Sequence, residues 1–305
     1  MKPIRFSLYL FGLEKLFGGD IRRVIEFVHE ADEAGLDQVV VSDHVVMGER
    51  ADRYPYGPFP VPPDYPWFEP MTTLAAMAAV TKRMRLAVGI LITPLRPAVL
   101  LAKQAATLDV IASGRLDLGI GTGWQEEEYT SSGIPFQGRK ARMIDQVRAM
   151  RELWQNAPAS FASKTVNFER IYSRPAPAGK SIPLHFGIAP TDDNITLMAE
   201  LADGWLPMLR TPSEYGPFAQ RIFEKLPAFG RTPDDFTVRA QVRPIKDASG
   251  EKTGRVSIDA SLATIPEMIA AGVTEFTVTP LSFVNDEAGL RQLVARVVRE
   301  AQSHR

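Results

Sequence analysis

Asp43 and His44 are the residues whose type and position best suit catalysis. They directly follow Asp37–Ser42, a continuous β-branched run that predicts a buried strand of a parallel sheet. An imidazole has an ordinary pKa of about 6.5 and exchanges protons at neutral pH, and a neighbouring carboxylate can bind a ligand, orient the ring or tune it. We interpret both residues as catalytic, with His44 handling the proton. The alternative is that Asp43 caps a turn and His44 contacts only the backbone.

A second candidate site is the stretch Arg115–Trp124, RLDLGIGTGW, which combines an apolar run with glycines at alternate positions. Its alternating leucine and isoleucine side chains predict a buried strand. Glycine permits a positive φ and carries no Cβ, so a ligand can approach the backbone closely. We therefore expect this strand end to contact a cofactor. The residues expected there are Gly121, Thr122, Gly123 and Trp124.

Charged and aromatic residues flank these two strands. The three consecutive glutamates Glu126, Glu127 and Glu128 are interpreted as a solvated first turn of a helix, where negative charge favours the helix dipole. The alternative is that one of them faces the pocket. A Pro-rich segment at about residues 48–70 cannot form a regular helix or strand and is expected to be a lid loop. Its aromatic rings suit either a cover over a flat ring or packing against the barrel rim or a second subunit. They are Tyr54, Tyr56, Phe59, Tyr65, Trp67 and Phe68.

The sequence does not favour hydrolytic or metal-dependent chemistry. There is no H-x-H or H-E-x-x-H spacing for a metal, no G-x-S-x-G turn for a serine nucleophile and no G-x-x-x-x-G-K-[ST] phosphate loop. His185 falls within a predicted strand and is interpreted as a core or inward-facing residue. We therefore expect no metal site.

The elements that must position these residues alternate between strand and helix. Eight apolar runs are each followed by a helical pattern, which predicts a parallel sheet with right-handed crossovers. The predicted strands are Ile4–Leu10, Asp37–Ser42, Arg85–Thr93, Arg115–Trp124, Pro183–Ile188, Gly204–Met208, Phe236–Pro244 and Val273–Thr279. The predicted helices are Ile21–Ala34, Met71–Val80, Ala98–Ile111, Arg139–Trp154, Asn194–Ala202, Tyr215–Leu226, Pro266–Ala271 and Leu290–Ala301. An irregular portion is expected at Ala157–Lys180, and a polar, Gly-bearing loop after Pro244.

Eight such units predict an α/β fold, a TIM (β/α)8 barrel with insertion segments, in one domain over residues 1–305. A doubly wound sheet is the competing fold, but its dinucleotide fingerprint needs G-x-G-x-x-G, and this chain reads G-x-G-x-G-W. Barrel active sites lie at the carboxyl ends of the strands. We therefore expect one shared mouth for Asp43, His44, Thr93 and residues 122–124.

Composition limits the partners. The formal net charge is -1 with no basic cluster, which argues against nucleic acid or an anionic membrane surface. The chain has no cysteine, so it forms no disulfide and uses no thiolate. No apolar run approaches the roughly 20 residues of a transmembrane helix, and the first residues lack a leader pattern. We expect a cytoplasmic homodimer that acts on a small molecule.

Four segments carry a resemblance to a known family. They are VSDHVV (Val41–Val46), the long stretch Pro62–Tyr129, the helix Arg139–Trp154 and ADGWLP (Ala202–Pro207). From about Arg5 to Pro207 the chain resembles the bacterial-luciferase-like superfamily of flavin and deazaflavin oxidoreductases, specifically its coenzyme F420-dependent branch. The resemblance implies a TIM barrel and hydride transfer between F420 and a small organic substrate. An FMN-dependent monooxygenase and a degenerate barrel without cofactor remain the alternatives.

The resemblance also implies roles for individual residues. It places Asp43 and His44 beside the reactive edge of the ring, with His44 handling the proton. A cis peptide in the third strand would lie within residues 89–91, between Ile90 and Leu91, against the ring face. Thr93 would contact the ring edge, and Gly121 to Gly123 would offer backbone donors.

Two departures from the family pattern affect the expected ligands. Trp124 stands where the family's sugar-phosphate dehydrogenases carry an acidic glutamate, which argues against that substrate class. The family's phosphate segment is Gly-Gly-x-Ser followed by an arginine-rich helix, whereas this chain has Leu197 where an arginine is common. Fewer bare amides and less positive charge weaken the expected phosphate binding. The corresponding residues here are Gly187, Ile188, Ala189, Pro190 and Thr191.

Overall fold

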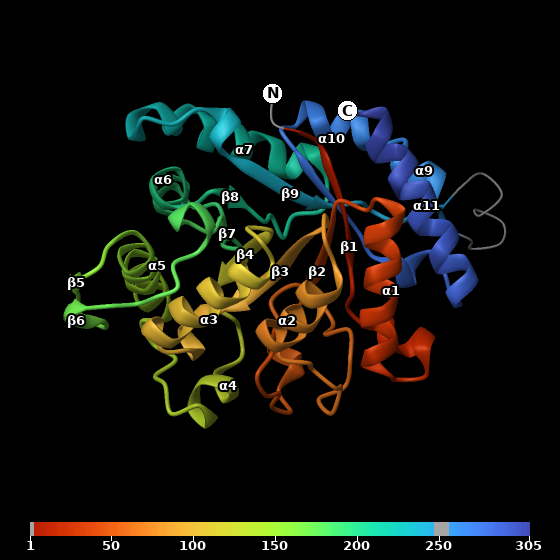
Figure 1. Cartoon of the computed structure of the whole chain (residues 1–305). Coiled ribbons are helices and arrows are strands. Elements are labelled where there is room, and N and C mark those ends of the chain that lie inside the picture. Colours follow the sequence, from red (N-terminus) through yellow and green to blue (C-terminus); the bar gives the residue numbers. More distant parts are fainter. Residues whose placement is uncertain (1–2, 247–255) are drawn as a thin grey trace.

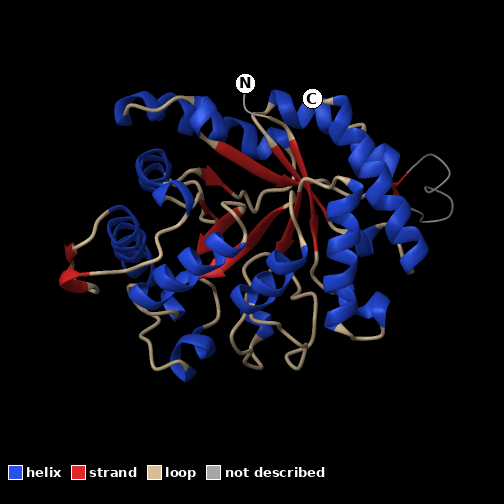
Figure 2. Ribbon diagram, viewed as in Figure 1, coloured by secondary structure: helices blue, strands red, loops and turns tan. Residues whose placement is uncertain are grey.

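The computed structural model describes residues 3–246 and 256–305. Parallel strands form a closed barrel in the order β1-β12-β9-β8-β7-β4-β3-β2. Figures 1 and 2 show the strands at the centre with helices around them. The predicted TIM barrel is confirmed, because all eight predicted strands take part. Their bounds are β1 Arg5–Tyr9, β2 Gln38–Val41, β3 Arg85–Ile92, β4 Leu116–Gly121, β7 Leu184–Phe186, β8 Gly204–Trp205, β9 Thr237–Gln241 and β12 Glu275–Val278.

The helices follow the predicted rhythm closely. The first shows how local sequence sets the ends: the Asp20 carboxylate accepts a bond from the backbone N–H of Arg22, and Gly35 ends the helix at a φ of 91°. The α-helices are α1 Ile21–Ala34, α2 Pro70–Val80, α3 Ala98–Ile111, α4 Glu126–Ser131, α5 Arg139–Gln155, α6 Asp192–Leu201, α7 Pro212–Lys225, α9 Ile258–Leu262, α10 Ile265–Ala270 and α11 Glu287–Ser303.

The insertions differ from the sequence prediction. The portion expected to be irregular contains an antiparallel hairpin, β5 Ala159–Ala162 with β6 Asn167–Ile171, at the edge of the molecule beyond α5 (Figure 1). A second short pair joins β10 Ile245–Lys246 to β11 Val256–Ser257. These strands are too short to show a clear alternation. Most of the polar loop expected after Pro244 lies outside the described residues.

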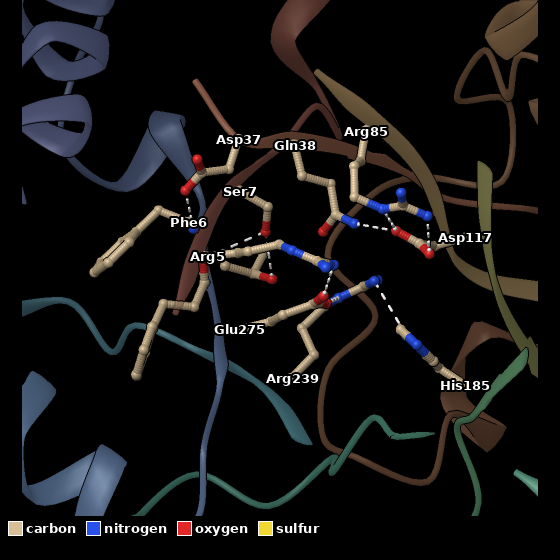
Figure 3. Close-up of polar contacts among 12 residues, drawn as sticks. Arg5, Phe6, Ser7, Asp37, Gln38, Arg85, Asp117, His185, Arg239 and Glu275 are labelled. Atoms are coloured by element: carbon tan, nitrogen blue, oxygen red, sulfur yellow. Dashed lines mark hydrogen bonds and ion pairs between the residues drawn. The ribbon is translucent and has the colours of Figure 1, made fainter. Parts of the chain in front are cut away.

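Charged side chains fill the barrel where its strands begin (Figure 3). The Glu275 carboxylate accepts bonds from Arg5 Nη1 at 2.9 Å and from Arg239 Nε at 2.8 Å. The Nη2 atom of Arg239 lies 3.2 Å from His185 Nδ1. His185 is buried and points into the barrel, so its interpretation as an inward-facing residue is confirmed.

A second carboxylate completes this layer. Asp117 accepts bonds from Gln38 Nε2 at 2.8 Å and from two nitrogens of Arg85, each at 2.6 Å. Buried carboxylates and guanidinium groups are tolerated only when they are paired and hydrogen-bonded. The bonds of Asp117 therefore tie β2, β3 and β4 together, and those of Glu275 and Arg239 tie β1, β7, β9 and β12, at the end of the barrel opposite the expected active site.

Burial and charge set the protonation of this layer. Burial, reinforced by the nearby positive charge of Arg239, lowers the pKa of His185 to about 4. For Glu275, burial raises the pKa, but the charges of Arg239, His185 and Arg5 outweigh it and hold the pKa well below its ordinary value. His185 is thus neutral and Glu275 ionised at neutral pH.

The free energy of unfolding should fall as the pH drops from about 6.5 to about 4. In this pH window His185 takes up a proton in the unfolded chain but not in the folded protein, so protonation favours unfolding. The contribution of neutral His185 to the free energy of unfolding is fully present above pH 6.5 and falls by up to about 3 kcal/mol across the window. Urea unfolding at stepped pH measures it. His185→Gln retains an acceptor for Arg239 but does not titrate. The free energy of unfolding of this variant should therefore decline less steeply with falling pH than that of the parent protein. Equal declines would contradict the assignment.

Candidate active site

Asp43 joins the end of β2 to the end of β3. Its carboxylate accepts the backbone N–H of Ile92 at 2.8 Å and both terminal nitrogens of Arg96, at 2.7 and 2.9 Å. Arg96 also donates to Glu69, the N-cap of α2, at 3.0 Å. Asp43 is thus buried and bonded on both oxygens, to β3 and to Arg96.

His44 is held by a carboxylate that the sequence interpretation placed in solvent. Its Nδ1 lies 3.1 Å from Oε2 of Glu128, whose other oxygen accepts the backbone N–H of Val45 at 2.7 Å. The Glu128 side chain is 0% exposed and that of His44 is 10% exposed. The interpretation of the three glutamates as a solvated turn is therefore wrong for Glu128, although it describes the exposed Glu126.

The spacing of the helix gave a signal for this contact. Gln125, Glu128 and Tyr129 stand at positions i, i+3 and i+4, so they share one face of α4, and all three are buried. Gln125 exchanges two bonds with the backbone of Gly48 at 2.8 and 3.2 Å. The buried face of α4 therefore binds the segment that follows β2 and begins the lid.

Three aromatic rings, those of Phe59, Trp67 and Trp124, pack around His44. Tyr54 packs on two of them, and the four aromatic residues are here called the aromatic cage. The ring of Trp67 lies 4.6 Å from the imidazole, centroid to centroid, and that of Phe59 lies 5.8 Å away. Trp124 is 6.3 Å away and packs on Phe59. The lid aromatics thus cover the expected catalytic histidine rather than forming a separate surface.

Two buried donors in the cage lack a partner among the described residues. They are the indole Nε1 atoms of Trp67 and Trp124. A buried N–H without an acceptor costs free energy. A ligand oxygen in the cage would satisfy these donors.

A cavity adjoins the cage beneath the lid. It has a volume of about 50 Å³ and is lined in part by Phe11, Glu14, Ser42, Tyr65 and Trp67. The Tyr65 hydroxyl donates to Glu14 at 2.8 Å and accepts the backbone N–H of Gly12 at 3.0 Å. These bonds attach the lid to the loop after β1.

The side chain of Ile90 explains two of the glycines. The peptide between Gly89 and Ile90 is cis, one residue before the predicted position, and the pairing of β3 with β4 shifts there. A Cβ on Gly121 would lie 2.2 Å from Ile90 Cδ1, and one on Gly187 would lie 2.6 Å from its Cγ2. The bare backbone at both positions therefore accommodates Ile90. Of the three alternate glycines, Gly123 has a positive φ, of 62°, and the expectation is wrong for the other two, Gly119 and Gly121.

The neighbouring candidate residues bond within the protein. Thr93 is fully buried and its hydroxyl donates to the carbonyl oxygen of Gly121 at 3.2 Å. Leu91 is also fully buried. The carbonyl oxygen of Thr122 accepts the hydroxyl of Tyr129, which ties the end of β4 to α4.

The expected phosphate segment, residues 187–191, leads into α6. Acidic side chains at the start of that helix oppose the binding of an anion. The carbonyl oxygens of Ile188 and Ala189 accept bonds from Trp205 and Asn194, at 3.1 and 2.8 Å. Thr191 caps α6, whose first turn carries Asp192 and Asp193. The hydrogen bond from Arg221 lowers the pKa of Asp192, so this helix end holds negative charge. Weakened phosphate binding at this segment stays a prediction.

The described parts of the chain offer neither a membrane helix nor a metal cluster. Within residues 3–246 and 256–305, no helix is long and apolar enough to cross a membrane. No group of three or more His, Cys, Asp or Glu residues there could hold a metal ion.

The chain is a closed parallel (β/α)8 barrel in which β3 carries a bulge and His44 follows β2. The chain belongs to the luciferase-like monooxygenase family, which it matches over residues 3–288. Members of this family are oxidoreductases and monooxygenases.

Individual proteins are similar to the chain in sequence or in fold. An uncharacterized protein of Mycobacterium tuberculosis is 32% identical over 179 residues, or 59% of this chain and 63% of the relative's length. The coenzyme F420-dependent tetrahydromethanopterin reductase of Methanopyrus kandleri aligns with a TM-score of 0.73 at 18% identity, covering 99% of both chains. The oxygenating constituent of 3,6-diketocamphane monooxygenase of Pseudomonas putida, in complex with FMN, aligns at 0.73 and 16% identity, covering 98% of both. These two structures are similar in fold.

Glu128→Gln should lower the free energy of unfolding by about 1–3 kcal/mol, because a buried amide oxygen cannot replace both charge-assisted bonds of the carboxylate. Glu126→Gln, two positions earlier on the same helix and exposed, is the matched control and should change it by less than about 0.5 kcal/mol. Urea unfolding measures both. Equal effects would show that the buried contact contributes nothing.

Proposed function

We propose that the protein is a coenzyme F420-dependent oxidoreductase that passes hydride between the deazaflavin and a small organic substrate. The observation that carries the proposal is the setting of His44. A proton-exchanging ring stands at the carboxyl end of a barrel strand, is oriented by a buried carboxylate and is enclosed by aromatic side chains. This setting suits proton transfer coupled to hydride transfer on a ligand held in the cage.

The residues around the cage fit a flat, largely apolar ring. The side chain of Ile90 would contact the face of the ring, and Gly121, Thr122 and Gly123 would lie along the edge of the ring. The unpartnered indole N–H groups of Trp67 and Trp124 would donate to ring or substrate oxygens. The segment Gly187–Thr191 would lie toward the phosphate. When bound, F420 supplies the carbon that carries the hydride.

The chain's own contribution is to hold and move one proton. The Glu128 carboxylate accepts from Nδ1, which keeps the proton there and leaves Nε2 free to exchange one with a substrate oxygen. The aromatic cage keeps water away from His44. Asp43 fixes the strand ends through Arg96 and Ile92 and so acts as a positioning residue.

A flavin monooxygenase is the second candidate, because one solved structure of the same fold holds FMN. A degenerate barrel is the third, because carboxylates stand at the amino end of α6, where a phosphate would bind.

Titration of the purified protein with F420 and with FMN, each alone, separates the three candidates. We expect saturable quenching of F420 fluorescence and weaker binding of FMN. The reverse order would favour the monooxygenase. Binding of neither cofactor at millimolar concentration would favour the degenerate barrel and contradict the proposal.

His44→Ala should reduce the rate of F420-dependent turnover by about 10²- to 10⁴-fold and leave F420 affinity within a few-fold of the parent, since the ring handles a proton rather than anchoring the cofactor. The rate is followed as F420 reduction with a panel of alcohols. His29→Ala is the control, because His29 lies exposed on α1 and bonds the carbonyl oxygen of Val80. Unchanged turnover in His44→Ala would remove this residue from the mechanism.

We further propose that the protein is a homodimer that uses α3. Apolar residues are distributed around this helix rather than confined to its buried side, and its exposed face carries several of them. The exposed apolar residues of that face are Val99, Leu100, Val110 and Ile111.

A charge on this face should break the dimer. Leu100→Glu should give a monomer by size-exclusion chromatography with light scattering, because the carboxylate would be desolvated at the interface. Phe229→Glu, at an exposed position that follows α7, should leave the mass unchanged. A monomeric parent protein, or a dimeric Leu100→Glu variant, would contradict the proposal.

A further inference from the structure

A second cavity opens beside β8 and β9 and is not part of the aromatic cage. It has a volume of about 300 Å³. Gln241, the last residue of β9, and Arg210, which follows β8, both line it. The carboxyl ends of parallel strands meet at one end of a barrel, so this cavity shares the barrel face on which His44 lies.

Two arginines line the cavity, and both are exposed. Among the described residues, neither guanidinium of Arg210 and Arg243 makes a hydrogen bond or an ion pair, although both residues line the cavity. The arginines inside the barrel, Arg85 and Arg239, are by contrast paired with carboxylates. Two arginines that line one cavity suit an oxyanion, because each guanidinium presents a fork of donors that matches carboxylate or phosphate oxygens.

A buried hydroxyl in the same wall also lacks a partner. Tyr215 is 1% exposed, lines the cavity, and its hydroxyl makes no hydrogen bond with any described residue. Burial, reinforced by the charge of Glu267, raises the pKa of Tyr215 to about 12, so the hydroxyl keeps its proton. A buried hydroxyl left unpaired costs free energy, which a bound oxygen acceptor would recover.

The carboxylates nearby set the charge balance. Glu267 lines the cavity opposite the arginines. Glu214 is engaged in the capping box of α7, where it accepts the backbone N–H of Arg210 at 2.9 Å and that of Thr211 at 2.8 Å. The lining thus carries two positive side chains and one negative one, and Glu267 weakens the attraction for an anion.

We infer that this cavity binds a small ligand through an oxyanion group, a phosphate or a carboxylate, which Arg210, Arg243 and Tyr215 hold. The inference does not depend on F420, because none of these residues belongs to the aromatic cage. The oxyanion is the shared chemistry of the two ligand sources, a phosphate ester and a carboxylic acid.

Isothermal titration of the full chain with inorganic phosphate and, separately, with succinate tests the site at low ionic strength, with sodium chloride at matched ionic strength as the blank. We expect saturable binding of at least one of them, and the tighter ligand identifies the source. Arg243→Gln and Arg210→Gln should each weaken it about tenfold, since one charge-assisted contact is lost. Tyr215→Phe should weaken it a few-fold.

Two further variants test whether the oxyanion binds in this cavity. Glu267→Gln should strengthen binding, because it removes the only acidic group that lines the cavity within the described residues. His44→Ala should leave it unchanged, which separates this site from the proposed redox site. The absence of saturable binding, or binding that neither arginine variant weakens, would overturn the inference whatever the cofactor titrations show.

Discussion

A buried carboxylate fixes the position of His44 at the end of β2. Glu128 is fully enclosed, and the imidazole of His44 and the backbone N–H of Val45 are its partners. An ionised group so deeply buried is costly unless hydrogen bonds compensate it. The end of β2 must therefore stay against α4, and this contact sets the position of His44 under the lid. The remaining features of the site follow from that constraint.

Packing at the adjacent strand ends extends the constraint. Ile90 projects from the irregular point of β3 into space that only glycine leaves open at positions 121 and 187. At the other end of the barrel, the bonds of Arg239 and Asp117 hold the strands on which this bulge depends (Figure 3). The two ends of the barrel thus differ: ion pairs stabilise the end where the strands begin, whereas aromatic and aliphatic side chains surround the candidate site at the carboxyl ends of the strands.

Much of this architecture was predictable because it depends on local pattern. Alternating apolar runs and helical periods gave all eight strands, and the place of His44 after a buried strand set it at the barrel mouth. Contacts between distant residues were not predictable in the same way. Glu128 looks solvated in a run of glutamates, and only the folded helix turns it inward. The role of Gly121 depends on Ile90, which lies far from it in sequence. The arginines beside β9 likewise have no signature in the chain.

The two proposed sites share one barrel face but differ in kind. The aromatic cage is enclosed, apolar and served by one histidine, whereas the cavity beside β8 and β9 is wider and lined by charge. The central claim is that the cage holds the deazaflavin with His44 at its reactive edge. A crystal structure of the protein with F420 tests it most directly. The account predicts that the ring lies against Ile90 with its reactive edge beside His44 Nε2. A ring bound elsewhere, or one whose reactive edge faces away from His44, would contradict it.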